Sequence, residues 1–261
     1  MLHARNFLAF IDDSSTPGGE SVLAGHIATV EAWEKFKPEW EAMLPFGTLA
    51  ENGKQHFKMS EMAALPERME RVPWFYRIIE EHVTLSLACR IDLTEYEAAL
   101  ERIRNNAQKL GLQYVNFDRF ENPFAYQFRA LMDQFHTDRP LLDPELADGK
   151  VDFYFDNRME EGFISATWDD YMSSRPDETK NRYGAKPIFG NDQTFLPLQA
   201  ADLWAWWVRE WYEEDASELP TKMENFDFGT WRGKKRPCLT ISYNEDQIVE
   251  GLMSTCVLTS D

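Results

Sequence analysis

The sequence predicts one α/β domain in which a mixed central sheet is flanked by helices. Short segments rich in apolar and β-branched residues, typical of strands, alternate along the chain with longer segments whose apolar residues recur every three or four positions, typical of helices. The 261 residues, with 43% hydrophobic content, are enough to bury one large core without disulfides. No internal repeat or clear linker divides the chain, so we expect residues 1–261 to form a single domain with helical insertions.

A hairpin near the N-terminus is predicted to start the sheet. Residues 6–12 and 21–30 are apolar and rich in β-branched side chains, and the turn-forming cluster SSTPGG separates them. The apolar residues of 31–44 then repeat at helical spacing despite Pro38, which predicts an amphipathic helix. Residues 56–62 fit either a loop or a short strand that enters a helix capped by Ser60.

The remaining predicted elements continue this alternation of strands and helices. In chain order they are a helix over 66–82, a strand over 83–93, a helix from Thr94 to about Leu110 with Glu97, Glu101 and Arg104 facing solvent, a helix over about 121–137, a strand over 151–158, a helix over 160–174, a short strand at IFG, an apolar helix over 196–214, a strand at LTISY and a terminal helix from near Asn244.

Charge and composition exclude several classes of protein. The formal net charge of −18 argues against a broad surface for duplex nucleic acid, because Lys and Arg supply most of the affinity for phosphates. Only the basic runs at 232–237 and, more weakly, 180–186 could guide a phosphate backbone. Charged residues interrupt every hydrophobic stretch, so neither a signal peptide nor a membrane span is predicted, and we expect a cytoplasmic protein.

Three aspartates occur in apolar surroundings. Asp12 and Asp156 are each expected at the end of a buried strand, and Asp202 lies inside the most apolar helix. A buried carboxylate costs several kcal/mol unless a cation or strong donors compensate it. A shared Mg²⁺ or Mn²⁺ would compensate all three, since hard cations prefer oxygen ligands. The alternatives are turn residues for Asp12 and Asp156, and for Asp202 an ion pair with an arginine.

Other polar residues near these aspartates have both a functional and a structural interpretation. Gln199, one turn before the helix aspartate, could hydrogen-bond that carboxylate or a substrate. Asp192 is either a functional carboxylate or a loop residue, and Glu61 is either a further ligand or a first-turn residue favoured by the helix dipole. His56 and Lys58 could help to bind phosphate or be ordinary surface residues. No HExxH, GxGxxG, GxxxxGK[ST] or GxSxG motif is present, which argues against zinc hydrolases, nucleotide-binding folds and serine hydrolases.

The segments FIDDS, YFD and LQAADLWAW, in this order and spacing, resemble the bacterial domain-of-unknown-function family 3800. Members of that family open with a Tyr-Ile-Asp-Glu-Ser-Gly-like motif and close with Leu-Gln-x-Ala-Asp-Leu. The resemblance covers about residues 6–212 and leaves 215–261 as a C-terminal extension. It implies an RNase H-like fold in which acidic residues converge from a first strand, a fourth strand and a late helix.

The residues of this chain match the family motifs one by one. The matches are Asp12 for the first aspartate, Asp13 for the glutamate, Ser14 for the serine, Asp156 for the central aspartate, and Gln199 with Asp202 for the closing motif. The chain departs from the family at Ser15, where glycine is usual, so the detail of this turn is not carried over.

These observations predict a divalent-metal-dependent phosphodiesterase or nuclease. The three aspartates would hold one or two Mg²⁺ or Mn²⁺ ions, and neighbouring residues would orient water or substrate. These neighbours are Gln199, Asp13, Ser14, Asp192, Lys58 and Glu61. The acidic chain favours a short, single-stranded or partner-delivered substrate. The alternative is a non-catalytic RNase H-like module that contacts proteins in a phage-defence or mobile-element system; a glycoside hydrolase with paired carboxylates fits the acid positions less well.

Overall fold

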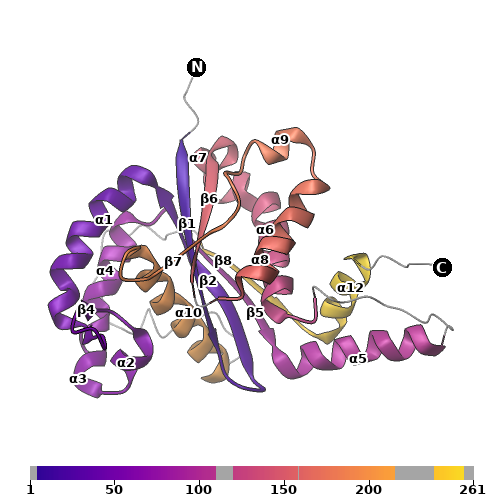
Figure 1. Ribbon diagram of the computed structural model, residues 1–261, viewed down its shortest axis with the longest axis horizontal. Coiled ribbons are helices and arrows are strands. Elements are labelled where there is room, and N and C mark those ends of the chain that lie inside the picture. Colours follow the sequence, from indigo (N-terminus) through magenta and orange to yellow (C-terminus); the bar gives the residue numbers. More distant parts are fainter. Residues whose placement is uncertain (1–4, 110–119, 158, 215–237, 256–261) are drawn as a thin grey trace.

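A six-stranded sheet forms the centre of the computed structural model, which describes residues 5–109, 120–157, 159–214 and 238–255 (Figure 1). The strand order is β7-β6-β1-β2-β5-β8, and β2 runs antiparallel to both neighbours while the other three pairings are parallel. The strands are β1 (Asn6–Ser15), β2 (Glu20–Thr29), β5 (Leu85–Asp92), β6 (Lys150–Asp156), β7 (Ile188–Gly190) and β8 (Cys238–Tyr243). The predicted mixed α/β architecture with a central sheet is therefore confirmed.

Helices cover both faces of this sheet. On one face lie α1 (Val30–Met43), α4 (Val72–His82) and α10 (Pro197–Glu214), whose buried residues share a core with one side of β1 and β2. On the other face lie α6 (Pro123–Leu142) and α8 (Glu161–Ser173). A third core joins α5 (Leu93–Lys109) and α12 (Glu245–Thr255) beside the end of β5.

Short elements complete the described chain. They are η1 (Leu44–Phe46), the two-stranded hairpin β3 (Thr48–Leu49) and β4 (Gln55–His56), α2 (Met59–Ala63), α3 (Pro66–Met69), α7 (Pro144–Asp148) and α9 (Asp177–Lys180). None of the helices in the described ranges combines the length and the apolar composition that crossing a bilayer requires.

Alternation along the strands decides which face each side chain reaches. In β1, Phe7, Ala9 and Ile11 belong to the core under α6 and α8, whereas Phe10 belongs to the core under α10. Successive strand residues point to opposite faces, so Asp12 points to the same side as Phe10. On the face of β1 that α10 covers, the side chains are thus apolar until Asp12 introduces a carboxylate.

Most predicted elements are confirmed within a few residues of their expected ends. These are the first hairpin, the helices predicted at 31–44, 121–137, 160–174 and 196–214, the strands at 83–93, 151–158, IFG and LTISY, and the terminal helix. The strand at LTISY pairs with β5, so the described part of the C-terminal extension belongs to the central sheet.

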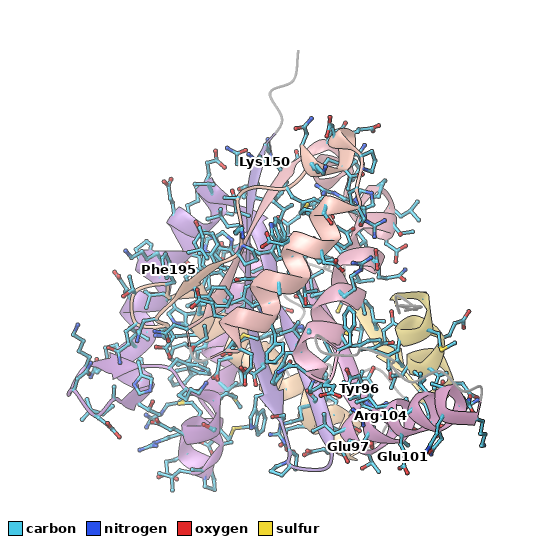
Figure 2. The ribbon with its side chains drawn as sticks, turned by 45° about the vertical axis from the view of Figure 1, so that its right-hand side comes forward. Tyr96, Glu97, Glu101, Arg104, Lys150 and Phe195 are labelled. Carbon is cyan, nitrogen blue, oxygen red and sulfur yellow. The ribbon has the colours of Figure 1, made fainter. Side chains whose placement is uncertain are left out.

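The outer helix α5 is amphipathic as predicted. Glu97, Glu101 and Arg104 are exposed, whereas Tyr96 is buried and its hydroxyl donates to the carbonyl of Phe120 (Figure 2). The predicted cap at Thr94 is wrong, because the Asp92 carboxylate accepts from the backbone N–H groups of residues 94 and 95. The predicted end at Leu110 lies outside the described residues.

Three other predicted boundaries are also wrong. The first strand does not end at residue 12, because its antiparallel pairing with β2 continues to Ser15. Residues 66–82 form two helices rather than one, and the second begins at Val72 with Pro73 in its first turn, where the missing N–H costs little. The predicted strand and helix at 56–62 are present as β4 and α2, but Ser60 lies inside α2, which begins after Lys58.

Glycine at position 25 is required by the close approach of β1 and β2. A Cβ at Gly25 would lie 1.9 Å from the carbonyl oxygen of Phe10 and 2.9 Å from the Cα of Ile11. We expect Gly25→Ala to lower the free energy of unfolding by about 3 kcal/mol, because backbone atoms must move. Gly162→Ala in α8, where nothing lies within 4 Å, is the matched control and should leave stability unchanged or slightly higher. Equal stability of both variants in urea unfolding would contradict this packing argument.

Candidate functional site

Strand register brings two of the predicted aspartates together. The parallel pairing of β1 and β6 reaches Ile11 opposite Phe155, and Asp12 and Asp156 are the next residues of the two strands. One residue earlier, the rings of Phe10 and Tyr154 stack with centroids 4.8 Å apart on the α10 side. The period of two in a strand therefore directs both carboxylates to the face that α10 covers.

The third predicted aspartate comes from α10 itself. Asp202 is buried, with 7% of its surface exposed, and Asp12 and Asp156 are 5% and 2% exposed. All three carboxylates therefore lie in the interior, as the apolar neighbouring sequence predicts.

Lys58 brings a positive charge to this cluster. Its Nζ donates to Oδ1 of Asp202 and lies 3.9 Å from Oδ2 of Asp12. The backbone N–H of Met59, at the start of α2, donates to Oδ2 of Asp202 at 2.6 Å. The predicted ion pair of Asp202 is thus present, with a lysine in place of an arginine, and Lys58 is a mostly buried member of the site rather than a surface residue.

The electrostatics of Asp12 show that this arrangement is costly. Burial raises the pKa of Asp12 well above its usual range, and the charge of Asp202 raises that pKa further. Lys58 lowers the pKa, while Asp13 and Asp156 raise it. A carboxyl group whose ionisation is opposed by burial and by like charges is typical of functional sites.

The residues that follow Asp12 tie β1 to its surroundings. The backbone N–H of Asp13 donates to Oδ1 of Asp12 at 2.9 Å. The Ser14 hydroxyl accepts from Nε of Arg209 on α10, and the same guanidinium donates to the hydroxyl of Thr16, both at 2.9 Å. Arg209 was not predicted as a site residue, because these hydrogen bonds join residues 195 and 193 positions apart in the sequence and leave no local pattern.

Gln199 holds three segments in place. Its Oε1 accepts from Nε1 of Trp40 at 2.9 Å and from the backbone N–H of Phe57 at 3.1 Å, and its Nε2 donates to the carbonyl of Asp192 at 3.1 Å. One alternative predicted from the sequence, a hydrogen bond from Gln199 to Asp202, is wrong. In the described residues the Gln199 side chain bonds to Trp40, Phe57 and Asp192 instead. Gln199 therefore positions the residue before Lys58 and the loop that carries Asp192.

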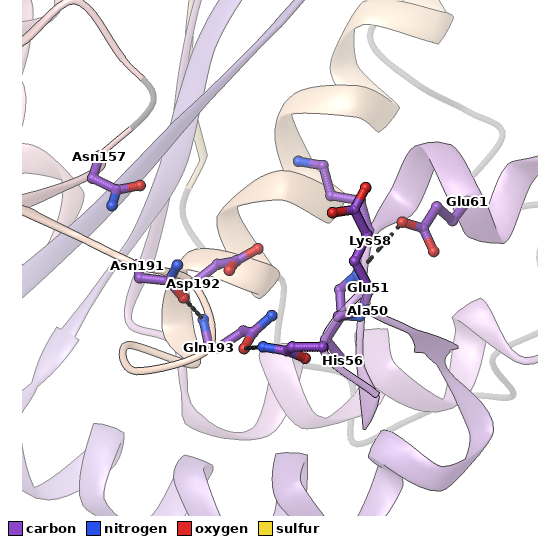
Figure 3. Close-up of a pocket in the computed structure, with 10 residues that line it drawn as sticks. Ala50, Glu51, His56, Lys58, Glu61, Asn157, Asn191, Asp192 and Gln193 are labelled. Carbon is purple, nitrogen blue, oxygen red and sulfur yellow. Dashed lines mark hydrogen bonds and ion pairs between the residues drawn. The ribbon is translucent and has the colours of Figure 1, made fainter. Parts of the chain in front are cut away.

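A pocket of about 550 Å³ adjoins the acidic cluster, because Lys58 is one of its lining residues. Figure 3 shows the residues that line it. Its walls are residues 50–52 between β3 and β4, His56, Lys58, Glu61, Asn157 and the loop 191–193. Lys58 belongs to both the pocket and the cluster, and Asn157 directly follows Asp156. Three predicted site residues, Lys58, Glu61 and Asp192, thus line this pocket, where Glu61 Oε1 lies 3.6 Å from Nε2 of His56.

The pocket walls also include residues that sequence analysis did not select as functional. They are Ala50, Glu51, Asn52, Asn157, Asn191 and Gln193. Asn52, Asn191 and Gln193 lie in the polar loops AENGK and GNDQ, and Asn157 directly follows a strand, but amide side chains at such places are also typical of ordinary turns.

The donor chemistry of the acidic cluster fits a hard divalent cation. Carboxylate oxygens are the ligands that Mg²⁺ and Mn²⁺ prefer, and an added positive charge would relieve the repulsion acting on Asp12. Within the described ranges, no three His, Cys, Asp or Glu side chains are arranged to hold a metal ion together. Asp12 and Asp202 are arranged instead around Lys58, whose ammonium would have to move aside for such an ion.

The basic segment 180–186 does not reach this site. Tyr183 bridges to Val151 near the start of β6, whereas Asp156 is at its end. Its cationic side chains form ion pairs with carboxylates, namely Lys180 with Asp177, Arg182 with Glu178 and Lys186 with Asp169. The stronger basic run at 232–237 lies outside the described residues.

No protein-family model matches this chain, and no curated protein matches it. The resemblance to the domain-of-unknown-function family 3800 therefore stays a prediction that rests on the quoted motifs.

The raised pKa of Asp12 predicts how stability depends on pH. Asp12 loses its proton at a higher pH in the folded chain than in the unfolded chain. Its contribution to stability is therefore fully present below the pKa that Asp12 has in the unfolded chain. This contribution is lost as pH rises through the pKa that Asp12 has in the folded chain. We expect Asp12→Asn to be more stable than the wild type at pH 7 by about 1–2 kcal/mol, with the difference vanishing in acid. Thermal melts between pH 4 and pH 8 would measure it, with the exposed Glu101→Gln as control. A variant less stable than the wild type at pH 7 would show that the contact with Lys58 outweighs burial and repulsion.

Proposed function

We propose that this protein is a divalent-metal-dependent phosphodiesterase that cleaves a nucleic acid or a nucleotide, and that its fold is RNase H-like. One observation carries the proposal: Asp12, Asp156 and Asp202 converge in a single buried cluster. They come from the first and fourth strands of the central sheet and from a late helix. This origin agrees with what the resemblance to family 3800 implies, which supports the proposal.

Each part of the site has a role in the proposed reaction. Asp12, Asp156 and Asp202 would supply the oxygen donors for Mg²⁺ or Mn²⁺. When bound, such an ion provides a nucleophile at neutral pH and stabilises charge on a phosphoryl oxygen. Lys58 contacts the acidic cluster and lines the edge of the adjoining pocket, so its ammonium can hydrogen-bond a phosphate oxygen held at the cluster.

The size and charge of the molecule limit the substrate. With a formal net charge of −18, the chain cannot attract long duplexes by its overall field. The described basic segment 180–186 is engaged in ion pairs away from the site. We therefore propose a short or single-stranded substrate.

A non-catalytic module that contacts another protein is the second candidate. The bonds from Lys58 and from the N–H of Met59 give Asp202 a structural explanation. Phe46 and Trp74 form an edge-to-face pair with centroids 5.6 Å apart, yet are 42% and 44% exposed, which favours a protein contact on that surface. Metal binding separates the two candidates.

We expect calorimetric titration with Mn²⁺ to show binding to the wild type and to Glu101→Gln, whose carboxylate is exposed on α5. Asp156→Asn and Asp202→Asn should lose it, because each removes a carboxylate from the cluster. Asp156→Asn is the more informative variant, since Asp202 also bonds to the start of α2. Absence of binding to the wild type would rule out the metal site.

We expect the wild type with Mn²⁺ to hydrolyse at least one of single-stranded DNA, single-stranded RNA, or a linear or cyclic dinucleotide. Asp156→Asn should reduce the rate by at least about 100-fold, because changes to residues that merely support metal ligands already reduce metal affinity or activity about 10–100-fold. The measurement is product formation by chromatography, with Glu101→Gln retaining the wild-type rate. No turnover on any substrate by an Mn²⁺-loaded wild type would favour the non-catalytic module.

A further inference from the structure

Four of the ten residues that line the pocket beside the acidic cluster carry carboxamide side chains. They are Asn52, Asn157, Asn191 and Gln193, which come from three separate segments, and Figure 3 labels the last three of them. Each carboxamide carries both hydrogen-bond donors and an acceptor. At about 550 Å³, the pocket falls in the range of about 300–1,000 Å³ typical of small-molecule sites.

Hydrogen bonds among these amides orient their free groups. Nδ2 of Asn52 donates to Oε1 of Gln193 at 2.9 Å, and the backbone N–H of Gln193 donates to Oδ1 of Asn191 at 2.7 Å. These bonds use acceptor oxygens and leave the NH₂ groups of Asn191 and Gln193 without a partner among the described residues. The side chain of Asn157 makes no hydrogen bond within the described structure either. The pocket thus presents donors, and at Asn157 also an acceptor, to a ligand.

The charges of the pocket exclude an anionic ligand at its centre. Glu51, Glu61 and Asp192 line it, and Lys58 faces them from the side of the acidic cluster. Carboxylates repel phosphate but accept hydrogen bonds from amino groups. A neutral ligand that carries both amino donors and ring acceptors matches this lining.

We propose that this pocket binds a nucleobase with an exocyclic amino group, adenine or cytosine, from the nucleotide whose phosphate lies at the acidic cluster. Asn and Gln recognise adenine through its amino group and ring nitrogen, and Glu and Asp accept from the amino group of cytosine. The link from the pocket to a nucleotide rests on the proposed function, because Lys58 and Asn157 join the pocket to the carboxylates. Such edge contacts require an unpaired base, which makes single-stranded nucleic acid the substrate class.

Titration with nucleosides tests the proposal without catalysis. Adenosine, cytidine, uridine and ribose are added to the full chain in the presence of EDTA, and side-chain amide resonances are followed by ¹H–¹⁵N NMR. We expect adenosine and cytidine to shift the resonances of Asn157, Asn191 and Gln193, and to bind at least about tenfold more tightly than uridine. Ribose should cause no shift at these residues.

Variants locate the binding site. Asn157→Ala and Asn191→Ala should weaken adenosine binding at least about fivefold. Asn105→Ala, which removes an exposed amide from α5, should bind adenosine as the wild type does. Equal binding of uridine and adenosine, shifts confined to other residues, unchanged affinity in both pocket variants, or no saturable shift at millimolar nucleoside would each overturn the proposal.

The nucleoside titration tests the base pocket independently of the proposed phosphodiesterase activity. Nucleosides contain no phosphodiester and need no metal, so their binding in EDTA is measured independently of metal binding and of hydrolysis. Selective nucleoside binding without Mn²⁺-dependent hydrolysis supports the base pocket and contradicts the phosphodiesterase. Hydrolysis without base discrimination contradicts the base pocket alone.

Discussion

The contact of Lys58 with the buried aspartates is the interaction on which the site depends. Carboxylates held together in the interior repel one another, and the pKa of Asp12 is raised by burial and by three neighbouring acids. The ammonium of Lys58 and the backbone N–H of Met59 oppose that repulsion at Asp202. The segment containing β4 and α2 must therefore lie against α10, and Gln199 fixes it there through its bond to the N–H of Phe57.

The same packing makes the site rigid. Asp12 and Asp156 continue two strands that are buried on both faces. Asp202 belongs to α10, which itself contributes three buried tryptophans to the core. Groups carried by regular, well-packed elements are held more exactly in place than groups on loops. The pocket, in contrast, is built mainly from the connections around β4, β6 and β7, so the structure combines a rigid acidic cluster with a wall made of loops.

Sequence periodicity was sufficient for most of the fold and for the meeting of the acids. Strands and helices were recognisable because their apolar residues repeat at two or at three to four positions. The errors have local causes: Asp92 and Thr94 are both competent caps, and Pro73 marks a helix start inside a segment whose apolar pattern continues across it. The partner of Asp202 could not be predicted, since Lys58 lies 144 residues away and a long-range ion pair leaves no periodic signal. The pocket amides were missed because Asn and Gln in loops are equally typical of turns.

The positions of the acids within otherwise regular elements argue for function over packing. β1 buries apolar residues on both faces up to Asp12, and β6 presents Tyr154 to the α10 side before Asp156. Asp202 interrupts a helix face of alanine, leucine and tryptophan. An alanine or asparagine at any of these positions would avoid the charge repulsion that raises the pKa of Asp12. Three elements far apart in sequence depart from their own apolar pattern, and the departures meet at one place. Local patterns are broken in this way where a site is needed, because the core alone gains nothing from a second and a third buried negative charge.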